Sequence, residues 1–350
     1  MGGSISVKST ENVGSEFTAV IKVKLNERAL IEDSPQLAFI DSFEILLIDD
    51  NEGDLKLISN ELIAMGLRCT LCSDASDAIN KIRGKNYELR IQGIDELQSK
   101  HDTPLLEAAN TGFQVHLQIN PDEFVNMYNI SQAITGPVLA SATNSPFLFG
   151  KRLWKETRIA LFTQSVDTRK RTEHNRDVSP RVTFGDNWIK NSILDIYKED
   201  LVRYRVLLNT EINEDVFEML ESGKAPKLMA LQVHNGTVYR WNRPCYGVGP
   251  NGKPHLRIEN RVLPAGPTIV DEMANAAFWL GLMIAYADKY EDITKLISFA
   301  DARDNFGKAA QYGIDTKFTW LNDEKITAVD LVRKELIPMA KKGLAKMKVN

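Results

Sequence analysis

The stretch that most constrains the fold of this chain runs from residue 234 to residue 268, because it has the pattern of a β-hairpin. Two strand-like runs, Gly236–Arg243 and Pro254–Leu263, flank the turn-forming residues Gly-Pro-Asn-Gly at 249–252. The sequence therefore predicts two antiparallel strands joined by a tight connection.

The second run of this hairpin alternates between charged and apolar residues. Since side chains alternate across a strand, Arg257, Glu259 and Arg261 fall on one face. The opposite face is apolar: Leu256, Ile258 and Val262. Guanidinium groups bind phosphate and carboxylate through two hydrogen bonds, and a carboxylate can hold a hard cation. The charged face is therefore either a site for Mg²⁺, a nucleotide and an acidic substrate or an ion-pair row that fixes strand register, and the spacing leaves both open.

Several longer strings go beyond this spacing. HNGTVYRWNRP and PHLRIENRVLPAGPT lie in the hairpin, and QVHLQI, ATNSPFLFGKRLWKETRIALF and QSVDTR lie upstream of it. Together they resemble the signature of the carboxylate–amine ligase family related to glutamate–cysteine ligase. The resemblance runs from about Leu89 to the C-terminus.

This resemblance implies an α+β fold in which helices pack on an antiparallel active-site sheet, as in glutamine synthetase and glutamate–cysteine ligase. It implies that Arg257 and Arg261 are catalytic and that Glu259 binds a metal ion. In the QVHLQI string, Gln114, His116 and Gln118 share one strand face. The residues implied to bind nucleotide or substrate are His116, Arg169, Asn235, Arg240, Trp241 and Arg243.

The implied reaction joins glutamate to cysteine at the expense of ATP. The γ-phosphoryl group of ATP moves to a substrate carboxylate, and an amine then displaces phosphate from the acyl phosphate to give γ-glutamylcysteine. The implied cofactors are ATP and Mg²⁺ or Mn²⁺, and the implied partners are small molecules.

The first 88 residues resemble other families. Residues 1–23 predict two strands around a turn and resemble the tail of a histidine-kinase ATPase domain. Residues 24–43 predict a linker. Residues 44–88 predict a strand, a helix at 55–65, a strand at 68–71 and a helix at 75–82, as in the first half of a response-regulator receiver domain, an α/β unit. Gly93 stands where a receiver has its phosphoacceptor aspartate, and Asp95 is the nearest candidate.

The ligase-family resemblance begins only at about Leu89, and this affects the activity that we expect. In the ligase family, glutamates on an N-terminal strand bind most of the metal, and the resemblance here begins after that strand. We therefore expect impaired ligase activity. The alternatives are a two-component signalling protein, against which the missing phosphoacceptor counts, and a catalytically inactive chimera.

The remaining predictions concern helices and surroundings. Predicted helices span 121–140 (ending near Gly136-Pro137), 152–162, 188–208, 214–220, 268–290, 293–306 and 327–344, and residues 90–113 predict a loop and a helix. The apolar stretch Met273–Ala287 is too short to span a membrane. A net charge of −4 does not indicate nucleic-acid binding. Three cysteines and no visible signal peptide indicate a cytoplasmic protein, and the oligomeric state stays open.

Overall fold

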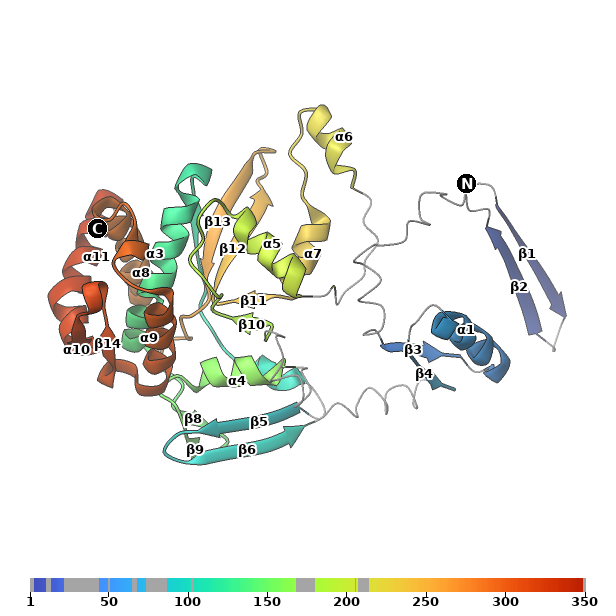
Figure 1. Ribbon diagram of the computed structural model, residues 1–350, viewed down its shortest axis with the longest axis horizontal. Helices are drawn as coiled ribbons and strands as arrows, with labels where there is room; N and C mark the ends of the chain where they lie inside the picture. The colour runs from blue at the N-terminus through green and yellow to red at the C-terminus, as the bar shows by residue number, and fades with distance from the viewer. Residues whose placement is uncertain are drawn as a thin grey trace. The chain divides into compact units, whose positions relative to one another are not determined.

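The computed structural model describes residues 3–10, 14–21, 44–49, 51–64, 68–73, 87–101, 104–167, 180–204, 206 and 214–348 (Figure 1). The chain divides into two compact units, Met1–Ile82 and Arg83–Asn350. The predicted linker at 24–43 and the predicted helix at 75–82 lie outside the described residues.

The first unit contains two small sheets. Strands β1 (Gly3–Thr10) and β2 (Gly14–Ile21) pair antiparallel, as the sequence predicts. Strands β3 (Glu44–Ile48) and β4 (Arg68–Cys72) pair in parallel, and α1 (Glu52–Ala64) lies between them in the chain. A parallel pair needs such a crossover, so the predicted strand–helix–strand order is confirmed.

The second unit is built around a three-stranded antiparallel sheet with the order β12-β13-β7 (Figure 1). These strands are β7 (Val115–Ile119), β12 (Asn242–Val248) and β13 (Pro254–Asn260). In the connection between β12 and β13, Gly249 N donates to Lys253 O at 2.9 Å, and Gly252 adopts a φ of 73°, a region that favours glycine. The predicted turn is confirmed.

The predicted first strand, Gly236–Arg243, is wrong as a single element. Its first residue ends the helix α7 (Met229–Gly236), and β11 (Tyr239–Arg240) pairs in parallel with β10 (Val182–Thr183) instead. The chain changes partner at Trp241, whose N–H donates to Thr183 O at 3.2 Å and whose carbonyl accepts from Arg261 N at 2.9 Å. Strand β13 likewise ends at Asn260, not Leu263.

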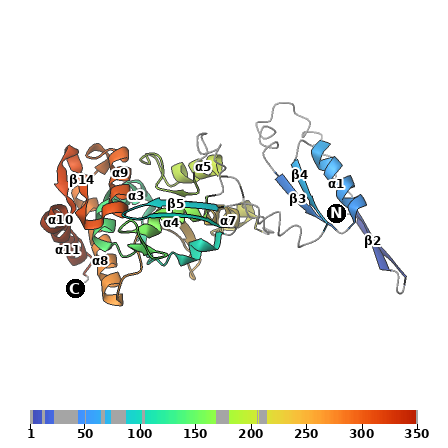
Figure 2. The ribbon, with the colours of Figure 1, turned by 90° about the horizontal axis from the view of Figure 1, so that it is seen from below.

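Residues 87–101 form a hairpin where the sequence analysis expected a loop and a helix. Strands β5 (Tyr87–Gln92) and β6 (Glu96–His101) pair antiparallel and pack against α4 (Thr157–Ser165) through a separate cluster of buried side chains (Figure 2). Leu89 and Ile91 are both buried, as the period of two in a strand requires, so the loop predicted at the start of this stretch was wrong. The helix predicted after the loop corresponds to the short 3-10 helix η3 (Pro104–Ala109).

Helix α3 (Phe124–Ala142) runs through Pro137, so the predicted stop near Gly136-Pro137 was wrong. A proline inside a helix costs about 3 kcal/mol. Residues 127–140 are all buried, and that packing outweighs the local preference. Gly136 permits a close helix contact, because a Cβ there would lie 2.9 Å from the carbonyl carbon of Asn305 in α9 (Phe299–Tyr312).

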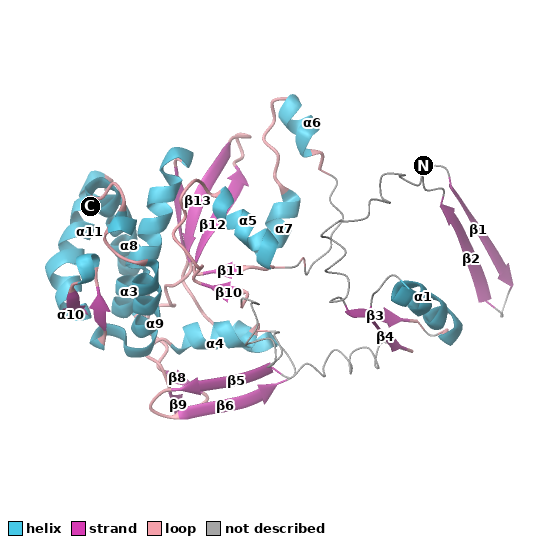
Figure 3. Cartoon of the chain, viewed as in Figure 1, coloured by secondary structure: helices cyan, strands magenta, loops and turns pink. Residues whose placement is uncertain are grey.

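The C-terminal helices cover the core on the side of α3 (Figure 3). Helix α8 (Ile269–Lys289) corresponds to the predicted helix at 268–290, and Thr268 caps it, because its hydroxyl accepts from Asp271 N at 3.3 Å. It packs against α11 (Ile337–Lys346) where Gly281 meets Gly343. No helix among the described residues is long and apolar enough to cross a membrane.

The remaining elements are shorter. Helices are observed within the predicted spans 152–162, 188–208 and 214–220, but with other bounds: α4 begins only at Thr157, and the other two are α5 (Leu194–Arg203) and α6 (Val216–Glu221). The other short elements are η3 (Pro104–Ala109), η4 (Pro121–Glu123), β8 (Phe147–Leu148), β9 (Lys151–Arg152), η5 (Ile293–Lys295), η6 (Gly313–Asp315), β14 (Lys317–Thr319), η7 (Leu321–Asp323), β15 (Lys325–Thr327), α10 (Ala328–Leu331) and the π-helix η8 (Val332–Leu336).

Candidate active site

One face of the three-stranded sheet carries most of the predicted site residues. In the register, His116 of β7 stands opposite Glu259 of β13, and Glu259 stands opposite Arg243 of β12. One step along the same face, the register aligns Gln118, Arg257 and Cys245. The opposite face is apolar, with Ile258 fully buried and Val115 and Ile119 nearly so, which confirms the predicted assignment of faces.

Glu259 lies at the centre of this face and is only 5% exposed. Its Oε1 lies 3.3 Å from Arg261 Nε, and its Oε2 lies 3.8 Å from Arg243 Nη1. The Cys245 thiol donates to the same Oε2 at 3.4 Å. The sequence analysis expected Arg257 and Arg261 to flank Glu259, but the ion pairs formed are with Arg261 and Arg243.

Arg243 is held in place by the end of helix α7. Its Nη2 donates to the carbonyls of Asn235 at 2.8 Å, Val238 at 3.2 Å and Gly236 at 3.3 Å. The carboxyl end of a helix carries partial negative charge, so it favours a guanidinium there. Asn235 also donates from Nδ2 to Pro244 O at 3.3 Å. The local sequence His-Asn-Gly therefore supports the site through a helix end and not through a strand.

Three guanidinium groups on this face hold buried nitrogens with no hydrogen-bond partner in the part of the chain that the structure describes. These are Arg243 Nε, Arg257 Nε and Arg261 Nη1. Burial and the neighbouring Arg243 lower the pKa of Arg261, which Glu259 opposes. Buried polar groups in native proteins are nearly always hydrogen-bonded, so the arrangement has capacity for an additional anionic acceptor.

Arg261 is positioned by its surroundings. Its guanidinium carbon lies 5.8 Å from the centre of the Tyr239 ring. Arg158 of α4 donates to the carbonyls of Arg261 (3.4 Å) and Val262, and its own Nε lies 3.0 Å from Glu156 Oε1. This buried pair therefore holds the segment that follows β13.

Two residues predicted to bind ligand lie elsewhere. Trp241 is 4% exposed and packs in the hydrophobic core, with ring centroids 5.6 Å from Phe162 and 5.5 Å from Phe306. Arg240 is 3% exposed and forms a two-pronged pair with Asp200 of α5, with Nη2 2.6 Å from Oδ1. Arg240 belongs to β11, which pairs with β10, and Trp241 lies between β11 and β12, so neither residue is part of the three-stranded sheet that carries Glu259. Arg169 lies outside the described residues.

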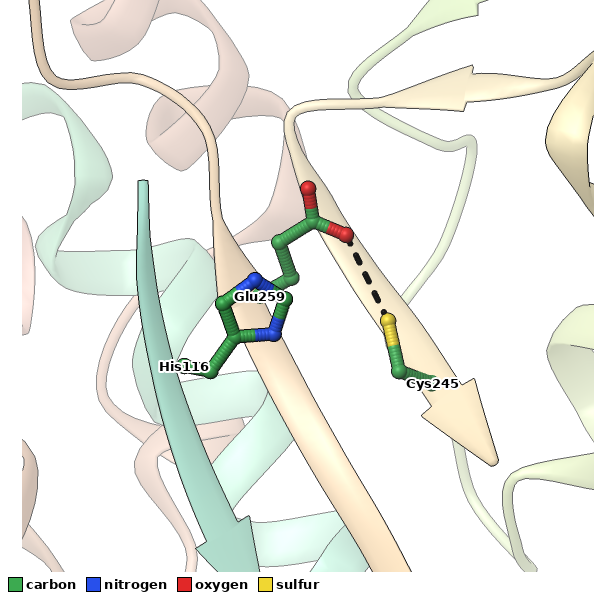
Figure 4. Close-up of side chains that lie close together, drawn as sticks. All are labelled: His116, Cys245 and Glu259. Carbon is green, nitrogen blue, oxygen red and sulfur yellow. Dashed lines mark hydrogen bonds between the residues drawn. The ribbon is translucent and has the colours of Figure 1, made fainter. Parts of the chain in front are cut away.

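Cys245 lies on the charged face but is not among the residues predicted from the sequence. Its thiol is partly buried, and burial together with Glu259 raises its pKa to about 12. The period of two from Arg243 places it on the charged face once β12 is known to begin at Asn242, so the misplaced strand boundary concealed it. One ligand atom each from His116, Cys245 and Glu259 lies within 4.8 Å of the others (Figure 4).

Comparison with known proteins identifies the class. A family model described as glutamate-cysteine ligase family 2 matches residues 65–346. The chain belongs to this family, whose members are ATP-dependent ligases of the glutamate–cysteine ligase type. The family model therefore matches from residue 65, whereas the resemblance noted in the sequence begins only at about Leu89. No curated protein matches the chain.

Proposed function

We propose that the Glu259 face binds ATP and an acidic amino acid, and that its reaction is the ligation of glutamate to cysteine. The observation that carries the proposal is a set of three buried guanidinium nitrogens around one carboxylate, on Arg243, Arg257 and Arg261, which have no hydrogen-bond partner among the described residues. Phosphate and carboxylate are the planar or tetrahedral oxyanions that guanidinium groups bind best.

The roles follow from position. Arg257 and Arg261 neutralise the charge that develops on the transferred phosphoryl group or on the substrate carboxylate, as positioned cations do in phosphoryl transfer. Arg243 sets the position of Glu259 and adds a third positive charge. His116 stands at the exposed edge of the same face, beside the nucleotide. Asn235 acts through Arg243, so it is a positioning residue.

The residues present do not by themselves fit Mg²⁺. This ion prefers about six oxygen ligands at about 2.0–2.1 Å. Within the described part of the chain, the cluster of candidate ligands at the site supplies one carboxylate, one imidazole and one thiol. Glu259 is therefore proposed as a single metal ligand, and no step is assigned to the ion.

This donor set leads us to propose that ligase turnover is low. Metal ions normally neutralise much of the charge in phosphoryl transfer. With this stabilisation reduced by about 4 kcal/mol, the rate falls about a thousandfold. The chain would then retain binding of ATP and substrate while forming little product.

The test measures γ-glutamylcysteine by mass spectrometry in a mixture of the full chain, ATP, glutamate, cysteine and Mg²⁺. We expect little product from the chain alone and more when a polypeptide carrying the family's glutamate-rich N-terminal strand is added. Rapid Mg²⁺-dependent product formation by the chain alone, lost in Glu259→Gln, would contradict the proposed impairment but not the proposed reaction. A chain that forms no product under either condition and binds no ATP would contradict both.

A second proposal concerns the first unit. Its parallel strands β3 and β4 with α1 between them support a receiver-like origin, and Asp49 follows the carboxyl end of β3. We infer that this receiver-like stretch lacks a working phosphoacceptor, because Gly93 stands at the expected position and Asp95, the nearest candidate, lies in the second unit and is paired with Arg152 at 3.0 Å. Incubation with a small phosphodonor and Mg²⁺ should leave the intact mass unchanged, and an adduct lost in Asp95→Asn would refute this.

A further inference from the structure

Three side chains of different chemistry converge on the charged sheet face, each from a different strand. Figure 4 shows His116 of β7, Cys245 of β12 and Glu259 of β13 directed toward one another. The group therefore combines a nitrogen, a sulfur and an oxygen donor within 4.8 Å.

The carboxylate of Glu259 is buried without a short contact to any described residue. Its three partners are Arg261 at 3.3 Å, Cys245 at 3.4 Å and Arg243 at 3.8 Å. Charge-assisted hydrogen bonds to a carboxylate are typically about 2.7–2.9 Å long. A carboxylate has about four acceptor positions. Oε1 can therefore keep Arg261 while Oε2, on the thiol side, takes another ligand.

We propose that His116, Cys245 and Glu259 form a binding site for a divalent transition-metal ion of the zinc type. Thiolate and imidazole suit Zn²⁺ and Co²⁺, whereas Mg²⁺ prefers oxygen alone. Three protein ligands with a fourth position open to water are the usual arrangement of a reactive zinc site. The inference goes beyond the ligase reaction and does not depend on it.

The charges and distances are compatible with this ion. A thiolate and a carboxylate together balance the two charges of the ion, so the net charge of the three ligands and the ion is zero. Before binding, the neutral thiol and the carboxylate carry −1, so Arg243 and Arg261 then face one negative charge fewer. When the sulfur–metal bond forms, the proton of the Cys245 thiol passes to solvent. Bond lengths of about 2.0–2.3 Å hold tetrahedral ligands at most about 4 Å apart, so the atoms must close by about 1 Å. His116 is exposed and can rotate to do so.

The experiment titrates Co²⁺ and Zn²⁺ into the full chain in the absence of nucleotide. Cys69 and Cys72, the other two cysteines of the chain, are thiols that could also bind Co²⁺, so every variant is made in a Cys69→Ala, Cys72→Ala background. We expect one Co²⁺ per chain, with the near-ultraviolet absorption of a thiolate–cobalt bond. A large excess of Mg²⁺ should not displace it.

The variants separate the three ligands from their neighbours. Cys245→Ser should abolish the thiolate absorption, and His116→Asn and Glu259→Gln should each weaken Zn²⁺ binding by more than the ~10–100-fold typical of losing an outer partner. His255 is the matched control, because it lies on the same face of β13 four residues from Glu259, and His255→Asn should leave the affinity unchanged. Circular dichroism checks that each variant is folded.

Three results would overturn the proposal. The first is the absence of stoichiometric Co²⁺ binding. The second is a Cys245→Ser variant that still binds Co²⁺ and still shows the thiolate–cobalt absorption. The third is displacement of Co²⁺ by Mg²⁺. Since no nucleotide or amino-acid substrate is present, none of these results bears on the proposed ligase reaction, and failure of the ligase assay leaves this measurement intact.

Discussion

Arg158 Nε lies 3.0 Å from Glu156 Oε1, and the two side chains are 7% and 0% exposed. Glu156 also accepts from Asn144 N and Ser145 Oγ, both at 2.8 Å. Arg158, fixed by Glu156, donates hydrogen bonds to the carbonyls of Arg261 and Val262. A buried ion pair in α4 and the residues before it thus holds the segment that carries one of the proposed catalytic arginines.

Arg158→Met should destabilise the fold by about 3–5 kcal/mol, because it leaves the buried Glu156 carboxylate without its counter-charge. Urea denaturation measures the change. The matched control is Lys155→Met, which breaks the exposed 3.6 Å pair with Asp315 and should change stability by less than about 1 kcal/mol. Equal effects of the two substitutions would show that burial of the Glu156–Arg158 pair has no energetic role.

The two faces of β13 should respond differently to neighbouring substitutions. Ile258 is 0% exposed, so Ile258→Asp places an unpaired charge in the core and should unfold the second unit. Glu259→Gln keeps the size of the side chain and should leave the fold intact. Thermal melts followed by circular dichroism decide this, and identical melting of both variants would contradict the assignment of faces.

The pair between Asp95 and Arg152 gives a specific dependence on pH. The side-chain hydrogen bonds from Arg152 lower the pKa of Asp95 from 3.8 to about 2. Since the folded state favours the ionised carboxylate, the pair stabilises the fold above about pH 4 and loses this contribution as the pH falls toward 2.

Asp95→Asn should therefore make the urea midpoint less dependent on pH between about 4 and 2 than it is in the wild type. Glu96→Gln is the control, because Glu96 is the next residue, at the start of β6, and is exposed, with a 3.2 Å pair to Arg90. If Asp95→Asn and the wild type lose stability in parallel over this range, Asp95 does not titrate as described.

The pattern of neighbouring residues predicts a strand or a helix start reliably where one side of the element faces the core and the other faces polar groups or solvent. The second hairpin strand, the glycine turn at 249–252 and the start of α8 at Thr268 could all be predicted, because alternation and capping are properties of neighbouring residues. The strand at 115–119 could be predicted for the same reason.

Tertiary packing decided the cases in which the prediction was wrong. Pro137 stays inside α3 because buried surface outweighs its helix-breaking tendency, which no local signal reports. Strand β12 begins at Asn242 because Trp241 bonds to β10, a segment about 60 residues earlier in the chain.

The start of β12 at Asn242 also decides which residues make up the site. Arg257 and Arg261 are near Glu259 in the sequence, but Arg243 reaches it across the sheet, and only the register shows this. Cys245 was missed with it. The separation of Arg240 from the site follows from its pairing with Asp200, which lies 40 residues away.

Calorimetric titrations of ATP and of glutamate into the full chain measure whether Arg243, Arg257 and Arg261 bind the anionic groups of ATP and substrate. A hydrogen bond to a charged group contributes about 1.5–3 kcal/mol, so changing any one of these arginines to Gln should weaken ATP or glutamate binding about tenfold to hundredfold. Arg303→Gln, on the exposed side of α9, should leave both affinities unchanged. If all four variants bind ATP and glutamate as the wild type does, the Glu259 face is not the binding site.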